Sequence, residues 1–472
     1  MSELAYLSWI DAAERIRNRE LGPVEYCEAL LERIDEHDST LHAFLHLAKE
    51  SALAQAREAQ IMLDDRAATL GPMHGVPFAL KDIIDVATLP TTAHSKILAD
   101  NIASEDAVVT AKIKAAGGIL LGKLSTHEFA FGGPCFDLPW PPARNPWDVR
   151  MFPGGSSSGS GASVAAGFVP AALGSDTGGS VRNPASMCGI VGMKATYGRV
   201  SRRGVIPLSY SLDHVGPMTR TVAENAGLLN VIAGHDPRDP GSANEAVPDY
   251  LAAARRGASE GIAGMRIGII GHFHREDLLA HPVVAKNIDD TLQILAGLGA
   301  EIVEVRTRPL AEFADANRVV LLSEGFAVHE KWMQTRPEDY AEMTRQKLLP
   351  GAFIRAVDYV QGVRNRVHFA AEIDRLLDDV DVLVCASSMD PPFPIDDAQA
   401  IERCYPRQAR APFNITGHPA LALPTGFTAG DAEPALPLSV QIVGRHFDEC
   451  TIYRVAAAYE QNTPWTERHP VL

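Results

Sequence analysis

A tract rich in glycine and serine at residues 153–162 contains the first side chains suited to covalent chemistry, the hydroxyls of Ser156 and Ser157. Tracts of this kind are often flexible linkers, which continue into solvated sequence. This one instead continues into residues 162–167, whose small side chains suit a closely packed helix. It also lacks the Lys-Ser/Thr pair of a Walker A loop and the third glycine of a dinucleotide-binding loop. A linker and a phosphate-binding loop are therefore the less favoured interpretations.

A second polar cluster follows at residues 174–184. Its two glycines, residues 178–179, precede Ser180 and allow the tight backbone curvature that points successive N–H groups into one cavity. Such an array stabilises an oxyanion during acyl transfer. The alternative interpretation is a polar turn in which Arg182 pairs with Asp176. Arg182 is also suited to a substrate carboxylate, but the internal pair is favoured.

Residues 156–184, with the two glycines before them, resemble the signature of the amidase signature family: Gly-Gly-Ser-Ser-Ser-Gly, small residues, then Gly-x-Asp-x-Gly-x-Ser-Val-Arg-x-Pro. Upstream, Gly-Val-Pro-Phe-x-Leu-Lys-Asp at residues 75–82 looks like the lysine motif of the same family. The intervals of 75 residues from Lys81 to Ser156 and of 24 more to Ser180 also fit that family. The resemblance covers nearly the whole chain and is weakest between about 240 and 400.

The resemblance implies a catalytic triad in which Ser180 is the acyl-accepting nucleophile, Ser156 the bridging serine and Lys81 the base. It implies as well that a cis peptide bond precedes Ser156 and that backbone N–H groups form the oxyanion hole. The expected oxyanion-hole donors are Thr177, Gly178, Gly179 and Ser180, and the expected supporting residues are Ser157, Asp176 and Arg182.

These implied roles agree with the acid–base properties of the side chains. A serine hydroxyl is a poor nucleophile at neutral pH and needs a positioned base. A lysine with the ordinary pKa of about 10.4 is protonated and cannot act as one, but burial among residues 78–80 is expected to lower the pKa of Lys81. Neutral Lys81 can then take a proton from Ser156 while Ser156 takes one from Ser180. Without the two serine clusters, a single lysine in an apolar strand would indicate a side chain that reaches solvent.

The elements that must position these groups follow an alternating pattern of helices and strands. Three helices are predicted in the first seventy residues: one capped by Ser8, one that begins at Gly22-Pro23, and one over residues 49–64. Further along, short apolar runs bounded by turn residues predict strands. The predicted strands are 75–82, 119–122, 265–270, 302–305, 380–385, 421–424 and 438–443, and the later predicted helices are 107–116, 285–298 and 448–461. This α/β pattern predicts a largely parallel or mixed sheet. The resemblance implies an α/β fold with a large mixed β-sheet core flanked by helices on both faces.

We expect residues 1–472 to form a single amidase signature domain. The length alone suggests about three domains of roughly 150 residues. The implied triad, however, comes from the first half of the chain, and strands similar to those of the family recur near residue 440, so the sheet must draw on both ends. The expected parts are N-terminal helices at 1–70, a catalytic core at 71–235, a more variable helical lobe at 240–400, and C-terminal strands and a helix that complete the core at 401–472.

The composition excludes several classes of function. The net charge of −16 argues against binding nucleic acid through bulk electrostatics. No apolar run is long enough to span a bilayer, and the N-terminus lacks the features of a signal peptide, so we expect a cytoplasmic protein without membrane contact. The six cysteines are far apart and form no CxxC pair, which is typical of reduced core residues. Cys135 and Cys188 follow no nucleophile turn and are interpreted as packing residues.

Two histidine pairs have spacing that can chelate a metal ion. His42 and His46 are four residues apart, as on one helix face, and His272 and His274 are two apart, as on one strand face. The first pair lacks the glutamate of a metalloprotease motif, and no clear carboxylate cluster frames the second. We therefore expect no metal ion and no cofactor.

The resemblance implies hydrolysis of a carboxylic amide with release of ammonia or an amine. The substrate pocket is expected to include Phe129, Phe131, Met151 and Phe152, which makes an apolar or aromatic acyl group plausible. The expected partner is a small-molecule amide, with a homodimer as an open alternative.

Other functions remain open at this stage. One is the glutaminase A subunit of a tRNA-dependent amidotransferase, which would need a partner to bind tRNA, and another is hydrolysis of carbamate or urea-type substrates. We favour a stand-alone amidase because the Gly/Ser tract and residues 414–419 differ from the pattern expected of such a glutaminase. A catalytically inactive scaffold is disfavoured because all three triad residues are present.

Overall fold

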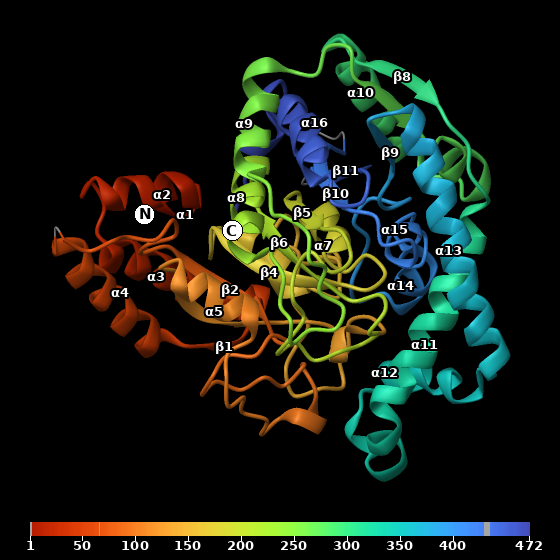
Figure 1. The fold of residues 1–472 in the computed structure, drawn as a ribbon. Helices are drawn as coiled ribbons and strands as arrows, with labels where there is room; N and C mark the ends of the chain where they lie inside the picture. Colours follow the sequence, from red (N-terminus) through yellow and green to blue (C-terminus); the bar gives the residue numbers. More distant parts are fainter. Residues whose placement is uncertain (1, 66, 429–434) are drawn as a thin grey trace.

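The computed structural model describes residues 2–65, 67–428 and 435–472 (Figure 1). Its strands are β1 (Phe44–Leu47), β2 (Pro77–Lys81), β3 (Ile119–Leu124), β4 (Ala171–Asp176), β5 (Val191–Lys194), β6 (His214–Thr219), β7 (Arg266–Ile269), β8 (Glu301–Glu304), β9 (Val382–Ala386), β10 (Ala420–Phe427) and β11 (Pro437–Val443). They form one 11-stranded sheet in the order β1-β3-β2-β4-β6-β5-β10-β11-β9-β7-β8. Parallel and antiparallel pairs both occur, so the predicted mixed sheet is confirmed.

Helices surround this sheet on both faces, as predicted. They are α1 (Ser2–Ala5), α2 (Trp9–Arg17), α3 (Pro23–Leu41), α4 (Lys49–Asp64), α5 (Val108–Ala115), α6 (Ser158–Ala165), α7 (Arg182–Cys188), α8 (Val222–Ile232), α9 (Tyr250–Glu260), α10 (Pro282–Gly297), α11 (Leu310–Thr335), α12 (Glu342–Leu348), α13 (Ala356–Asp379), α14 (Ala398–Cys404), α15 (Ala411–Ile415) and α16 (Glu449–Gln461). Helices α8, α9 and α16 pack against one another, while α6 and α7 form a second pair against the sheet. No helix in the described ranges is both long and apolar enough to cross a membrane.

Local signals account for the N-terminal helices. The side chain of Ser8 accepts a hydrogen bond from the N–H of Asp11 and so caps α2, as predicted. Gly22 precedes Pro23 at the start of α3, and α4 has the predicted bounds. The four-residue strand β1 between α3 and α4 was not predicted, because all its side chains are half-buried and show no alternation.

The Gly/Ser tract is partly helical, which differs from the prediction that the helix follows it. Helix α6 begins at Ser158, inside the tract. A side chain at Gly159 would come within 2.4 Å of the Ala43 carbonyl oxygen and 2.5 Å of the Ser125 nitrogen. Glycine therefore lets the first turn of α6 lie directly against backbone from two other segments.

The middle of the sheet combines early and late parts of the chain. Strand β2 lies parallel to both β3 and β4, and β4 runs antiparallel to β6. The C-terminal strand β10 pairs with both β5 and β11. Every residue of β2 to β6 and of β11 is buried. The long helices α11 and α13 lie side by side at the opposite side of the molecule from α1 to α4 (Figure 1).

Candidate active site

Lys81 is the last residue of β2 and is fully buried. Its Nζ lies 2.7 Å from Ser156 Oγ and 2.8 Å from Ser175 Oγ, and donates a hydrogen bond to each. The structure thus brings together Lys81 and Ser156, two of the three implied triad residues. Ser175 belongs to the second polar cluster, but sequence analysis assigned it no role because the motif does not show that β4 lies beside β2.

The environment of Lys81 favours the neutral amine. Burial lowers the pKa of Lys81 from its usual range to about 7, while the carboxylates of Asp176 and Asp213 act in the opposite direction. Near neutral pH, a substantial fraction of Lys81 therefore has a lone pair that can accept a proton.

Ser156 follows a cis peptide bond with Gly155, as the resemblance implies. The Gly155 N–H donates to Asn183 Oδ1 at 2.9 Å, and the Ser156 carbonyl accepts from the N–H of His127 at 3.0 Å. The next residue, Ser157, connects the loop of Ser156 to the polar cluster at residues 174–184. Its N–H donates to the carbonyl of Ser180 at 3.2 Å.

Ser180 lies on the turn between β4 and α7 and is partly exposed, unlike Lys81 and Ser156. Among the described residues, its hydroxyl makes no hydrogen bond, including with Ser156. A side chain at the neighbouring Gly178 would meet only Asn317 Oδ1, at 3.6 Å. The backbone at Gly178 therefore leaves space beside the turn of Ser180.

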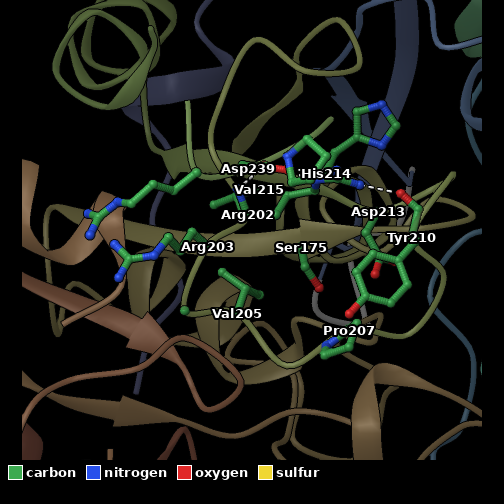
Figure 2. A pocket seen from close by; sticks show the side chains of 13 residues that line it. Ser175, Arg202, Arg203, Val205, Pro207, Tyr210, Asp213, His214, Val215 and Asp239 are labelled. Carbon is green, nitrogen blue, oxygen red and sulfur yellow. Dashed lines mark hydrogen bonds and ion pairs between the residues drawn. The ribbon is translucent and has the colours of Figure 1, made fainter. Parts of the chain in front are cut away.

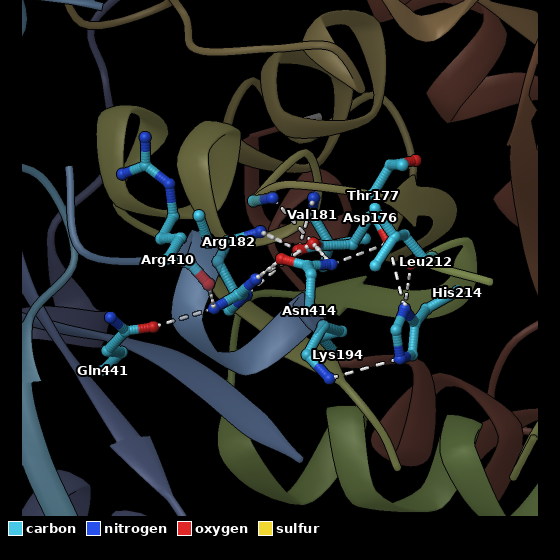
Figure 3. Close-up of polar contacts among 12 residues, drawn as sticks. Asp176, Thr177, Val181, Arg182, Lys194, Leu212, His214, Arg410, Asn414 and Gln441 are labelled. Atoms are coloured by element: carbon cyan, nitrogen blue, oxygen red, sulfur yellow. Dashed lines mark hydrogen bonds and ion pairs between the residues drawn. The ribbon is translucent and has the colours of Figure 1, made fainter. Parts of the chain in front are cut away.

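The turn that holds Ser180 is organised by the buried carboxylate of Asp176 (Figure 3). Oδ1 accepts the N–H of Gly179 at 2.8 Å, and Oδ2 accepts the N–H groups of Val181 at 3.2 Å and Arg182 at 3.4 Å. The side-chain amide of Asn414 donates to Oδ1 at 2.8 Å. One side chain therefore determines the course of the backbone on both sides of Ser180.

Arg182 forms the internal pair with Asp176, with Nε and Nη2 each 3.0 Å from a carboxylate oxygen. Its remaining contacts are the carbonyl of Arg410 at 3.0 Å, Gln441 Oε1 at 2.9 Å and Asn414 Oδ1 at 2.6 Å. Burial alone would raise the pKa of Asp176, but the Arg182 guanidinium holds it well below its usual range. The pair is thus charged and saturated with hydrogen bonds.

The set of N–H groups that are available as oxyanion-hole donors differs from the predicted set at one position, Gly179. The Gly179 N–H is used by Asp176, so it is not free to face an oxyanion. Within the described ranges, the N–H groups of Thr177, Gly178 and Ser180 donate to no other protein group. Thr177 is held in place through its hydroxyl, which donates to Asp213 Oδ1 at 2.6 Å.

A cavity of about 380 Å³ reaches Ser175 from the side of β6 (Figure 2). Its lining includes Arg202, Tyr210, Asp213 and His214. Arg202 forms an ion pair with Asp239, in which Nη2 lies 3.0 Å from Oδ1. Through Ser175 the cavity reaches a hydrogen-bond partner of Lys81, and none of the four residues expected in the substrate pocket lines it.

The four residues expected in the substrate pocket occupy two kinds of environment. Phe129 is buried against the rings of His329, Trp332 and Tyr340, and Phe152 is buried in a small cluster with Phe393. Phe131 and Met151 are partly exposed. Their role in binding substrate stays a prediction.

The histidine pairs are not arranged as their spacing suggested. His42 ends α3 with a left-handed backbone, whereas His46 lies on β1. His272 and His274 lie at a helical turn rather than on a strand. In the part of the chain that the structure describes, one group could hold a metal ion: Asp374, His418 and His446.

Comparisons with known proteins concern the whole chain. A family model for amidases matches residues 25–453. The A subunit of the glutamyl-tRNA(Gln) amidotransferase of Chloroflexus aggregans is 39% identical, over 100% of this chain and 99% of that protein. A solved structure from a vestigial protein complex that reveals the evolutionary origins of an s-triazine catabolic enzyme has a TM-score of 0.88 and 31% identity, over 97% and 98% of the two chains. The native peptide amidase of Stenotrophomonas maltophilia has a TM-score of 0.84 and 29% identity, over 98% of each.

Replacing Asp176 by asparagine should destabilise the protein strongly. Asp176→Asn leaves the Arg182 guanidinium buried without its carboxylate, which typically costs about 3–5 kcal/mol. The free energy of unfolding from urea titrations measures the effect. The control Asp358→Asn breaks an exposed pair with Arg355 on α13 and should leave the urea midpoint unchanged. Equal midpoints for Asp176→Asn and the wild type would contradict the structural role of this carboxylate.

Proposed function

The chain belongs to the amidase family, and we propose that it cleaves carboxylic amide C–N bonds through an acyl-enzyme formed on Ser180. The observation that carries the mechanism is the 2.7 Å contact between Lys81 Nζ and Ser156 Oγ, beside a partly exposed Ser180. A buried amine with a pKa of about 7 is suited to act as a base at neutral pH.

In the first half of the reaction, Ser180 Oγ attacks the amide carbon. Rotation of the Ser180 side chain brings its hydroxyl to Ser156, which accepts its proton and passes its own to neutral Lys81. The attack places negative charge on the former carbonyl oxygen, and the free N–H groups of Thr177, Gly178 and Ser180 are the donors that stabilise it. The proton then returns from Lys81 through Ser156 to the nitrogen of the leaving group, and the C–N bond breaks.

In the second half, water attacks the ester between the acyl group and Ser180. The same relay removes a proton from the water and returns it to Ser180 Oγ as the carboxylic acid leaves. Ser175 supports Lys81 throughout, since its hydroxyl lies 2.8 Å from Nζ and limits the amine to one position between two serines.

Replacing Ser180 by alanine should abolish covalent labelling by a fluorophosphonate probe, because the hydroxyl of Thr177 on the same turn is bound to Asp213. Intact-mass spectrometry after incubation with the probe measures the label. The control Ser163→Ala removes a buried serine of α6 whose hydroxyl, among the described residues, donates only to the Ser160 carbonyl, and it should label like the wild type. Active-site labelling that persists in Ser180→Ala would refute the assignment.

The rate of hydrolysis should depend on the ionisation of Lys81. Because protonated Lys81 cannot accept a proton, kcat/KM should fall about tenfold per pH unit below about pH 7 and level off above it. Asp213→Asn removes a carboxylate that favours the ammonium form and should move the midpoint to lower pH. Initial rates between pH 5.5 and 9 test both expectations. A midpoint above pH 9 would contradict a depressed lysine pKa.

The relatives favour the amidotransferase alternative over the stand-alone amidase that sequence analysis favoured. The protein from Chloroflexus aggregans, which is named as one subunit of an amidotransferase, matches this chain over its full length. We therefore propose as a second candidate that this chain is a glutaminase subunit that works with a partner protein. The net charge of −16 agrees with leaving the RNA to that partner.

A substrate panel with and without a partner distinguishes the two candidates. A glutaminase subunit should release ammonia from glutamine, should co-purify with another protein from its native cells, and should be more active in that complex. A stand-alone amidase should hydrolyse other amides without a partner. The panel contains glutamine, aliphatic and aryl amides, dicarboxylic amides, esters and carbamates. Full activity on a non-glutamine amide as a purified single chain would exclude the subunit candidate.

A further inference from the structure

Two histidines and one aspartate form a cluster outside the candidate active site. Asp374 is on α13, His418 lies between α15 and β10, and His446 lies between β11 and α16. His418 Nε2 lies 3.0 Å from Oδ1 of Asp374, and His446 Nδ1 lies 3.4 Å from the same oxygen. The centroids of the two imidazole rings are 3.9 Å apart. Three separate segments thus bring two ring nitrogens and one carboxylate oxygen together.

The contacts on the far side of each ring determine which nitrogen carries the proton. The Thr416 hydroxyl donates to the Pro412 carbonyl at 2.9 Å, so it can only accept from His418 Nδ1, which lies 2.9 Å away. His446 Nε2 lies 3.1 Å from the Thr416 carbonyl, which can also only accept. Both rings therefore carry an N–H on the side of Thr416. In its neutral form, each ring then points a lone pair at the Asp374 carboxylate.

The cluster therefore needs a cation between its three electron-pair donors. Two lone pairs and a carboxylate oxygen repel one another at these distances unless a positive charge lies between them. Burial lowers the pKa of His418 to about 4, although Asp374 acts in the opposite direction. Near neutral pH, the His418 ring thus carries no second proton that it could donate to the carboxylate.

The geometry of the cluster fits a four-coordinate metal ion. In a tetrahedral site with bonds of about 2.0–2.1 Å, neighbouring ligand atoms are about 3.3–3.4 Å apart, close to the two distances from Asp374 Oδ1 to the ring nitrogens. All three ligand atoms lie within 4.8 Å of one another. Metal-binding histidines are commonly oriented through the other ring N–H, as both rings are here by Thr416. The side chains of Asp374 and His446 are 51% and 32% exposed, so an ion can enter from solvent.

We propose that Asp374, His418 and His446 bind a zinc ion, with water as its fourth ligand. Imidazole nitrogens and carboxylate oxygens are among the ligands that zinc prefers in proteins. Sequence analysis expected no metal ion because it considered only histidines that are close together in the chain. The ligands of this site come from three distant segments, and no short motif contains them.

The ion has a structural role near the candidate active site. Thr416, which orients both rings, follows Asn414 by two residues, and the side-chain amide of Asn414 donates to Asp176 Oδ1 at 2.8 Å. Bound zinc therefore ties α13 to the segment that supports the turn of Ser180. An ion that binds only the folded state also stabilises it. The inference does not depend on the proposed amide hydrolysis, because its test measures binding and stability.

Zinc binding to the full-length protein tests the proposal. Metal ions are first removed with EDTA, and the EDTA is then removed by dialysis. Isothermal titration calorimetry with zinc chloride should show one ion bound per chain. At a free zinc concentration of about one hundred times Kd, Tm should rise by about 2–3 °C. A wild-type protein that binds no zinc would overturn the proposal.

Two pairs of variants show whether the ion binds at this cluster. Asp374→Asn should raise the Kd for zinc at least about tenfold, whereas Asp379→Asn, at another exposed aspartate of α13, should keep the wild-type Kd. His446→Gln should also weaken binding, and its control is His368→Gln, at an exposed histidine of α13. Wild-type Kd values in folded Asp374→Asn and His446→Gln would contradict the assignment. Thermal unfolding without zinc shows whether each variant folds, and the wild-type titration decides the matter if neither does.

Discussion

The carboxylate of Asp176 is a negative charge with no access to water, and the candidate active site is built around the groups that form hydrogen bonds with it. Three backbone N–H groups of its own turn, the guanidinium of Arg182 and the amide of Asn414 all donate to it. Leaving any of these bonds unmade is costly in a buried position. The turn therefore has one low-energy course, and that course presents Ser180 at the surface of the core.

Lys81 is subject to two opposing requirements. It must be buried to lose its proton near neutral pH, yet the carboxylates of Asp176 and Asp213 favour the protonated form. Pairing with Arg182 reduces the effect of Asp176, since the two charges largely cancel at a distance. The same ion pair thus serves two purposes: it shapes the turn of Ser180, the proposed nucleophile, and it keeps Lys81, the proposed base, from being too strongly protonated.

Sequence reasoning predicted best what local pattern determines. The bounds of α4 and the cap at Ser8 were predicted correctly because caps and hydrophobic periodicity act within a few residues. The large mixed sheet was implied by the family resemblance. The contact of Ser175 with Lys81 was not predictable, since it depends on the pairing of β2 with β4 across some ninety residues of chain. Which N–H groups of the turn stay free also depends on a side chain, Asp176, whose direction the motif does not reveal.

The contacts of Arg182 have a consequence for the synthesis of the protein. The three proposed reacting side chains lie within the first 180 residues, whereas Asn414 and Gln441, which hold Arg182, lie near the C-terminus. During synthesis, the ribosome therefore adds the proposed reacting residues long before it adds the residues that hold Arg182 in place. Until β10 joins β5 in the middle of the sheet, the nascent chain has the proposed catalytic side chains without the arrangement that would make them reactive. Activity is in this way linked to completion of translation.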